Sequence, residues 1–176
     1  RAPEGSPIRE RLRQVWNYRL KGAQRDVDVW QRLLAIHSLV IPVSENIETW
    51  LKFCSTARKS GRMNLCQRTL RKLLNLTPAS SSSSMLTLTA GTPPVNARVM
   101  YAYIKYLWAT KREAEALDQL KQFTSRLSSD EPKLQAKCYL HLGLWQRSLE
   151  DELTDATVKQ VLGYLELATR FDEKGY

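Results

Sequence analysis

The chain has 176 residues, 43% of them hydrophobic in type, so it is long enough to bury a core of its own. Its formal net charge is +9, and the whole excess lies in residues 1–72, which hold 15 basic and 6 acidic residues. No run of 18 apolar residues occurs and the first ten residues contain no apolar stretch, so we expect neither a membrane-spanning helix nor a signal peptide.

The basic excess of the first part indicates a polyanionic partner on that side, although a solvated basic face would give the same count. The three cysteines are Cys54, Cys66 and Cys138; they form no CxxC pair and lie in apolar helical stretches. A thiol in such a place usually acts as a small buried hydrophobe. We therefore expect a reducing, cytoplasmic compartment.

Apolar residues recur at helical spacing along nearly the whole chain. Ile8, Leu12 and Val15 open the first such series, with steps of four and three. No segment alternates strictly enough to indicate a strand. We therefore predict an all-α chain of about eight helices, at 8–20, 27–40, 45–60, 63–76, 96–111, 112–127, 131–149 and 156–171.

Several residues mark where these helices begin and end. Pro42 ends one helix, and Ser44 is the predicted N-cap of the next. Gly61 breaks the third helix from the fourth, and Pro78 ends the fourth. The stretch 78–94, "PASSSSSMLTLTAGTPP", is too poor in large apolar residues to order itself, and we predict a long flexible loop there.

Eight helices in four antiparallel pairs, repeating at roughly 34 to 45 residues, are typical of an α-solenoid of tetratricopeptide-like or HEAT-like repeats. Trp50, Gly61 and Leu70 match the aromatic, small and apolar positions of one such repeat, and the pair Leu142 and Gly143 matches part of another. We therefore treat 1–176 as a single helical-repeat segment.

The sequence shows no constellation of catalytic residues. The motifs HExxH, GxSxG, GxGxxG and GxxxxGK[ST] are all absent, and the acidic run from Glu150 to Asp155 lacks the ligand spacing of a calcium loop. His37 and His141 lie in apolar helices, where a histidine at the edge of the core is far commoner than a metal ligand. We expect no enzyme activity and no metal in this segment.

Five tryptophans fall on the apolar faces of the predicted helices, namely Trp16, Trp30, Trp50, Trp108 and Trp145. Bases stack only on exposed aromatic rings, so these positions favour packing anchors over a nucleic-acid platform.

Three of the four predicted inter-helix turns are basic. They carry Arg19 and Lys21, then Lys59, then Lys111 and Arg112. Equivalent turns of stacked repeats lie along one edge, roughly 10 Å apart, so cations from three repeats would converge there. Converging cations without carboxylates favour a bound polyanion. A plain solvated edge is the alternative that this pattern leaves open.

Four segments resemble the FAT region of target of rapamycin kinases, within the phosphatidylinositol 3-kinase-related protein kinases: "GAQRDVDVWQRLLAIHSLV", "ETWLKFCSTARKSGR", "YAYIKYLWATKREA" and "CYLHLGLWQRSL". The resemblance covers most of residues 8–172. It implies a helical scaffold that wraps the kinase domain of a larger serine/threonine kinase in nutrient signalling. Its implied partners are the kinase domain, neighbouring FAT repeats and the other subunits of the complex, and its implied location is the cytoplasm, with recruitment to the lysosomal or vacuolar membrane.

The resemblance also implies inositol hexakisphosphate as a structural cofactor in a basic pocket. The residues here that match the pocket of the family are Arg19, Lys59 and Arg112. Arg62, Lys111 and Lys137 are close enough in sequence to add further contacts, whereas His141 stands where the family favours a basic side chain.

Two other functions remain open at this stage. A free-standing tetratricopeptide-like adaptor would bind protein partners in the groove of the solenoid and would ignore inositol phosphates. A helical-repeat RNA-binding protein would account for the basic excess, but the unequal repeat lengths disfavour a register of one base per repeat. No nucleic acid is therefore expected as partner.

Overall fold

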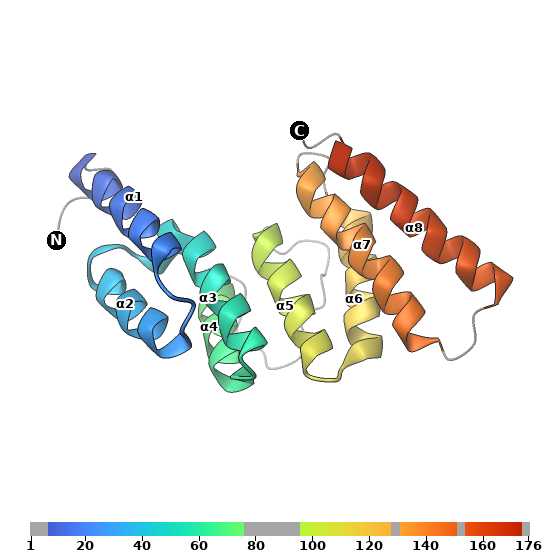
Figure 1. Cartoon of the computed structure of the whole chain (residues 1–176), viewed down its shortest axis with the longest axis horizontal. Coiled ribbons are helices and arrows are strands. Elements are labelled where there is room, and N and C mark those ends of the chain that lie inside the picture. The colour runs from blue at the N-terminus through green and yellow to red at the C-terminus, as the bar shows by residue number, and fades with distance from the viewer. Residues whose placement is uncertain (1–6, 76–95, 128–130, 151–153, 174–176) are drawn as a thin grey trace. The chain divides into compact units, whose positions relative to one another are not determined.

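Figure 1 shows the computed structural model of the chain, which describes residues 7–75, 96–127, 131–150 and 154–173. These residues form eight α-helices and one short 3-10 helix, with no strand among them, so the predicted all-α class is confirmed. The predicted loop 78–94 lies outside the described residues. The chain divides into two compact units, 1–102 and 103–176.

The first unit holds four complete helices and the beginning of a fifth. The helices are α1 (Pro7–Gly22), α2 (Val27–Val40), α3 (Ile47–Lys59) and α4 (Met63–Asn75), with η1 (Val43–Asn46) before α3. Helix α5 (Ala97–Ala109) begins here and ends in the second unit. The side chains buried at the centre of the first unit include Leu34, Ile41, Phe53, Leu70 and Met100.

Asp26 fixes the start of α2. Its side chain accepts hydrogen bonds from the amides of Asp28 and Val29, both at 2.9 Å, which satisfies two of the unpaired donors at a helix N-terminus. The prediction that Ser44 caps the next helix was wrong. Ser44 lies inside η1, and α3 starts after Asn46, whose side-chain oxygen instead accepts the hydroxyl proton of Thr49.

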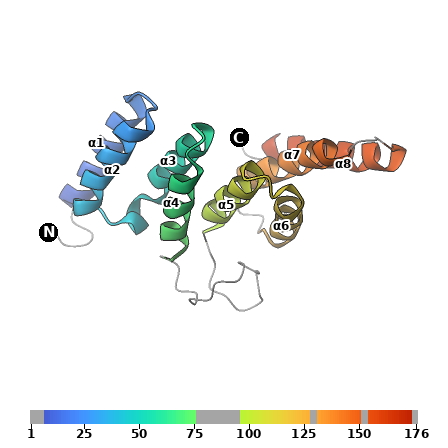
Figure 2. The ribbon, with the colours of Figure 1, turned by 90° about the horizontal axis from the view of Figure 1, so that it is seen from below.

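Helices α3 and α4 form an antiparallel hairpin, and Figure 2 shows them side by side. The break predicted at Gly61 is confirmed: this residue has a φ of 75°, a conformation that glycine adopts without a Cβ penalty. The next amide, of Arg62, donates to the carbonyl of Ala57 at 2.9 Å and so closes the end of α3. The turn therefore places the last residues of α3 beside the first residues of α4.

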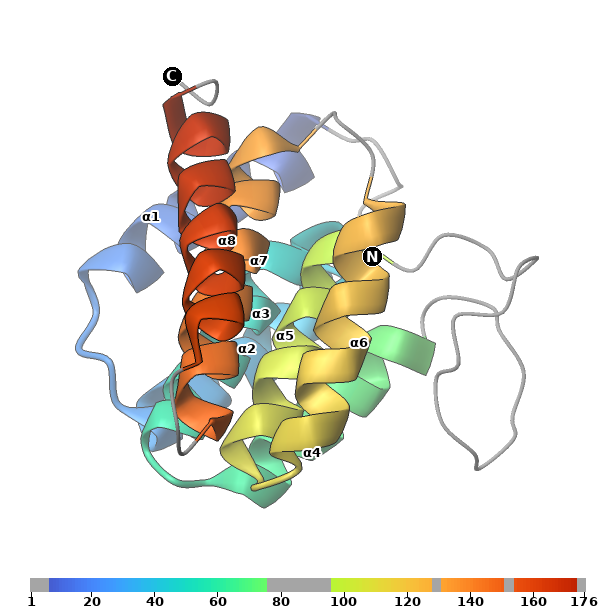
Figure 3. The same ribbon diagram turned by 90° about the vertical axis from the view of Figure 1, so that its right-hand side faces the viewer.

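The second unit contains the end of α5, then α6 (Glu113–Arg126), α7 (Pro132–Leu149) and α8 (Asp155–Glu173). Helices α7 and α8 pack along each other, side by side in Figure 1, and Figure 3 shows α8 in front of α7. Gly143 permits this contact, because a Cβ there would lie 3.3 Å from a side-chain carbon of Leu165. Trp108 of α5 stacks on Trp145 of α7, with 4.3 Å between ring centroids, as expected of packing anchors.

No helix in the part of the chain that the structure describes is long and apolar enough to span a bilayer.

Candidate anion-binding site

A pocket of about 440 Å³ lies in the first unit, where the C-terminal half of α3 meets the connection between α1 and α2. Three of its lining residues are cations and three carry hydroxyl groups, and an indole completes the wall. The lining residues are Arg25, Trp30, Lys52, Ser55, Thr56, Lys59 and Ser60.

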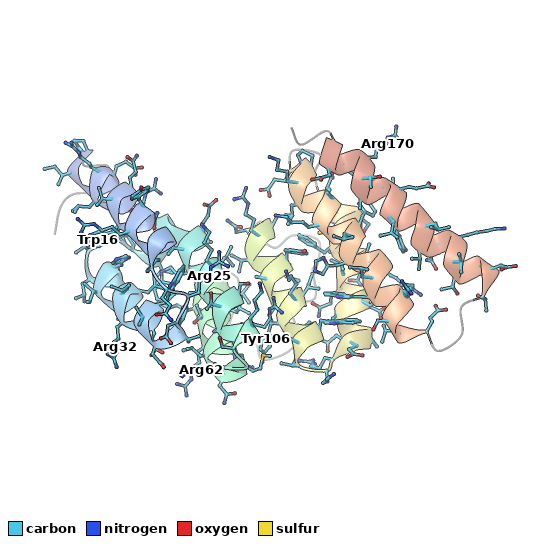
Figure 4. The ribbon with its side chains drawn as sticks, viewed as in Figure 1. Trp16, Arg25, Arg32, Arg62, Tyr106 and Arg170 are labelled. Carbon is cyan, nitrogen blue, oxygen red and sulfur yellow. The ribbon has the colours of Figure 1, made fainter. Side chains whose placement is uncertain are left out.

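The connection between α1 and α2 is held by hydrogen bonds that fix the backbone around Arg25. The indole Nε1 of Trp30 donates to the carbonyl of Gln24 at 3.1 Å, and the amide of Asp26 donates to the same carbonyl at 2.8 Å. Trp30 is itself buried, with 5% of its surface exposed. Arg25 is therefore presented from a short, well-anchored segment, and Figure 4 labels it there.

Lys52 and Lys59 come from a single face of α3. Seven residues separate them, which is close to two helical turns, so both side chains project from the same side of the helix. Both are exposed. Their spacing along α3 is about 10 Å, which suits an extended polyanion better than a single phosphate.

No carboxylate lines this pocket, and the nearest acidic residues in sequence are engaged elsewhere. Asp26 caps α2, and both oxygens of Asp28 accept hydrogen bonds from Arg62, at 2.7 and 2.8 Å. Arg25, Lys52 and Lys59 form no ion pair with any described carboxylate. The arrangement therefore fits an anion, which would relieve the repulsion among the three cations.

Arg19 lies at a different pocket of the same unit. That pocket has about 240 Å³ and lies between α1 and α2, with Arg19 exposed on its edge. Its other lining residues are Trp16, Leu20, Leu33, Ile36 and His37, so it is largely apolar. Of the three residues matched to the family pocket, Lys59 is thus the one that lines the basic pocket.

Arg112 belongs to the second unit. It follows Lys111, whose φ of 66° makes the turn from α5 to α6, and its guanidinium pairs with Glu115. The ammonium of Lys111 lies 3.8 Å from a carboxylate oxygen of Glu113. Both cations therefore have acidic neighbours on α6.

The other residues named from the sequence do not line the basic pocket. Arg62 is held by Asp28, as described above. Lys137 is exposed on α7, and its carbonyl lies 2.9 Å from Nδ1 of His141. The His141 ring meets the edge of Trp145, at 5.3 Å between centroids, so it lies beside the core of the second unit as a core-edge histidine would.

The sequence analysis missed Arg25 and Lys52. The spacing of Lys52 and Lys59 was available as a signal, since residues seven apart share a helix face. Arg25 could not have been chosen in this way, because its position depends on the tertiary contact between the α1–α2 connection and α3. Within the described ranges, no cluster of three or more His, Cys, Asp or Glu side chains could hold a metal ion.

Comparison with known proteins places the chain in a family. The model of the FAT domain matches residues 2–176. The chain is 36% identical to the serine/threonine-protein kinase mTor of Drosophila melanogaster over 96% of its own length, and 36% identical to the serine/threonine-protein kinase TOR2 of Saccharomyces cerevisiae over 99%. It is 34% identical to the serine/threonine-protein kinase TOR of Arabidopsis thaliana over 98%. The chain spans only 7% to 8% of the length of these relatives.

Proposed function

Because the chain belongs to the FAT domain family, we propose that it is a non-catalytic helical scaffold segment of a TOR-type serine/threonine kinase whose basic pocket holds inositol hexakisphosphate as a structural cofactor. The short share of each relative that it covers supports the scaffold role, since most of such a kinase lies outside this segment. Its partners are then the rest of the parent chain and the subunits of its complex.

The observation that carries the cofactor proposal is the convergence of Arg25, Lys52 and Lys59 without a lining carboxylate. Each bound phosphate would accept charge-assisted hydrogen bonds from these groups, and the hydroxyls of Ser55 and Ser60 would add neutral donors. Arg25 comes from the α1–α2 connection and the two lysines from α3, so one polyanion would join two elements of the unit. In this way the ligand stabilises the folded segment rather than taking part in chemistry.

Arg19 and Arg112 remain predicted contacts of the same ligand, on the basis of the family resemblance. Each is tested by its own alanine variant, separately from the pocket cations. Arg62, Lys111 and Lys137 are tested only if those variants change affinity.

The test is calorimetric binding of inositol hexakisphosphate to the 176-residue chain at about 150 mM salt, where exposed charges are largely screened. The variant Arg25→Ala/Lys52→Ala should bind at least about a hundredfold more weakly, because each lost charge-assisted contact is worth roughly tenfold or more. The control variant Arg68→Ala/Arg71→Ala removes the same charge from exposed positions of α4 outside this pocket, and should bind nearly as the wild type does.

Equal losses in the two double variants would mean that affinity follows net charge, and the pocket would then have no special role. Absence of binding to the wild-type chain would overturn the cofactor proposal for this segment. Inositol monophosphate serves as a ligand control, because one phosphate cannot span the two lysines of α3.

A further inference from the structure

Helices α1 and α2 each present a stripe of apolar side chains near their surface. On both helices the members follow one another at steps of three or four residues, which places them along one face of the helix. The members are Ile8, Leu12 and Val15 on α1, and Val29, Leu33, Ile36 and Val40 on α2. The two leucines are half-buried, whereas each of the other members has between 40% and 68% of its surface exposed.

The two stripes meet at the apolar pocket between α1 and α2. The pocket has a volume of about 240 Å³ and is lined by Leu33 and Ile36 from the stripe of α2. From α1 it is lined by Trp16, which Figure 4 labels, and by Arg19, which continues the stripe of that helix one turn after Val15. The pocket and the two stripes therefore form one groove, the α1–α2 groove.

Three arginines surround the α1–α2 groove. Arg11 on α1 and Arg32 on α2 each lie three residues after one member of a stripe and four residues before another, so each lies beside its stripe on the helix surface. Arg19 lies at the end of the stripe of α1. All three are exposed, and none forms an ion pair with a described carboxylate.

The acidic residues of the same two helices are engaged with other cations. Glu10 of α1 pairs with Arg13 at 2.7 Å, and Asp28 of α2 pairs with Arg62 at 2.7 Å. The rim of the groove is therefore positive, while its walls are apolar. A partner complementary to it has apolar side chains at its centre and acidic side chains at its edges.

The dimensions of the groove match a short helix. From Ile8 to Arg19, and likewise from Val29 to Val40, each wall extends for about 16 Å, which is the length of three helical turns. Side chains at steps of three and four residues form the ridges between which the side chains of another helix pack. A third helix can therefore lie along α1 and α2 and cover both stripes.

We propose that the α1–α2 groove docks an amphipathic helix of a partner protein, with apolar residues at every third and fourth position and acidic residues beside them. The apolar residues would bury the exposed side chains of both stripes, and the carboxylates would pair with Arg11 and Arg32. The proposal does not depend on an inositol phosphate, because none of the groove residues lines the basic pocket.

Two other occupants fit this groove less well. A second copy of the chain would bring its own Arg11 and Arg32 against those of the first copy, and the like charges would repel one another. A bilayer surface would cover exposed apolar residues beside arginines, but it would leave the pocket between the helices without a side chain to fill it.

The test is fluorescence anisotropy of two labelled helical peptides of about 15 residues, which is four turns of helix. Both carry leucine at every third and fourth position, and the flanking positions are glutamate in one peptide and lysine in the other. The 176-residue chain should bind the glutamate peptide at least about tenfold more tightly than the lysine peptide. The variant Arg11→Glu/Arg32→Glu should prefer the lysine peptide, because its rim now repels the acidic one.

Matched variants on α8 serve as controls. Lys159→Glu/Arg170→Glu makes the same change of charge at exposed positions there, and should keep the preference of the wild type. Ile36→Ser should weaken binding of the glutamate peptide by about tenfold, because apolar area is lost from the contact. Leu162→Ser removes an apolar side chain of similar exposure, 52% against 57%, and should leave binding unchanged.

No binding of either peptide to the wild-type chain, or equal binding of both, would overturn the proposal, and so would a preference that the α8 charge variant reverses as well. Loss of glutamate-peptide binding in the full-length parent protein would assign the groove to neighbouring repeats and overturn it too. Two further results would do the same: a dimer that Ile36→Ser dissociates, or displacement of the peptide by vesicles of phosphatidylcholine and phosphatidylserine.

Discussion

His37 is a buried histidine whose ring stacks on Trp16, at 4.3 Å between centroids. Its Nδ1 makes no hydrogen bond with a described residue, and burial lowers the pKa of its imidazole. The folded chain therefore disfavours the charged form of this ring.

The stability of the chain should consequently fall in mild acid. The unfolded chain binds a proton at this histidine with a pKa of about 6.5, higher than the folded chain does, so the contribution is complete above that pH and is lost as the pH falls below it. Thermal unfolding followed by circular dichroism between pH 8 and 5 measures the effect. His37→Phe keeps a stacking ring that cannot titrate, and should flatten the dependence.

At the scale of single residues, the sequence predicted correctly where a residue type has one common role. The tryptophans illustrate this, since Trp30 and Trp145 are buried and Trp50 packs edge-on against Phe53. Arg25 shows the opposite case. Its importance comes from a pocket that exists only after α2 and α3 have packed, and nothing local to its position reveals that contact.

Two glycines on neighbouring helices allow a prediction at the scale of elements. Gly143 of α7 faces Leu165 of α8, and an added Cβ would also lie 3.5 Å from the carbonyl oxygen of Val161, whereas a Cβ on Gly163 of α8 meets no other atom within 4 Å. Alanine favours a helix interior over glycine by about 1 kcal/mol. Gly163→Ala should therefore raise the free energy of unfolding by about that amount.

Gly143→Ala gains the same helical preference but must displace Leu165, so we expect it to gain less than Gly163→Ala does. Gly143→Leu should destabilise the chain by roughly 1–3 kcal/mol, because the α7–α8 contact would be overpacked. Urea unfolding measures all three variants. A Gly143→Leu chain as stable as the wild type would show that α7 and α8 do not approach closely at this point.

The elements themselves were largely predictable, because helical periodicity is repeated in every segment and several breaks carry Gly or Pro, such as Gly61 and Pro42. The start of α3 is an instructive failure. A serine after a proline resembles an N-cap, but the chain first makes a turn of 3-10 helix, and the side chain of Asn46 is engaged by Thr49. A 3-10 turn and a local hydrogen bond from Thr49, three residues along the chain, stand here in place of the predicted cap.

At the scale of the whole molecule, the basic excess of the sequence falls within the first of the two units. The basic excess lies within residues 1–72, and the pocket lined by Arg25, Lys52 and Lys59 lies within the first unit. Composition alone predicted a polyanion on that side but could not distinguish a pocket from a solvated edge. The distinction depends on which acidic residues are already engaged, as Asp26 and Asp28 are.

A ligand held in that pocket should stabilise the first unit by mass action. At a free concentration a hundredfold above its Kd, inositol hexakisphosphate would add about 2.7 kcal/mol, which slows amide exchange through ligand-sensitive openings by about a hundredfold. Hydrogen exchange measured by mass spectrometry should therefore show the largest protection in α2 and α3. Protection at the α5–α6 turn would add Arg112 to the contacts predicted from the family. The amides of α8 serve as the internal control. Protection from exchange spread evenly over all helices would indicate a diffuse effect of charge, because only a localised site protects the amides of α2 and α3 more than those of α8.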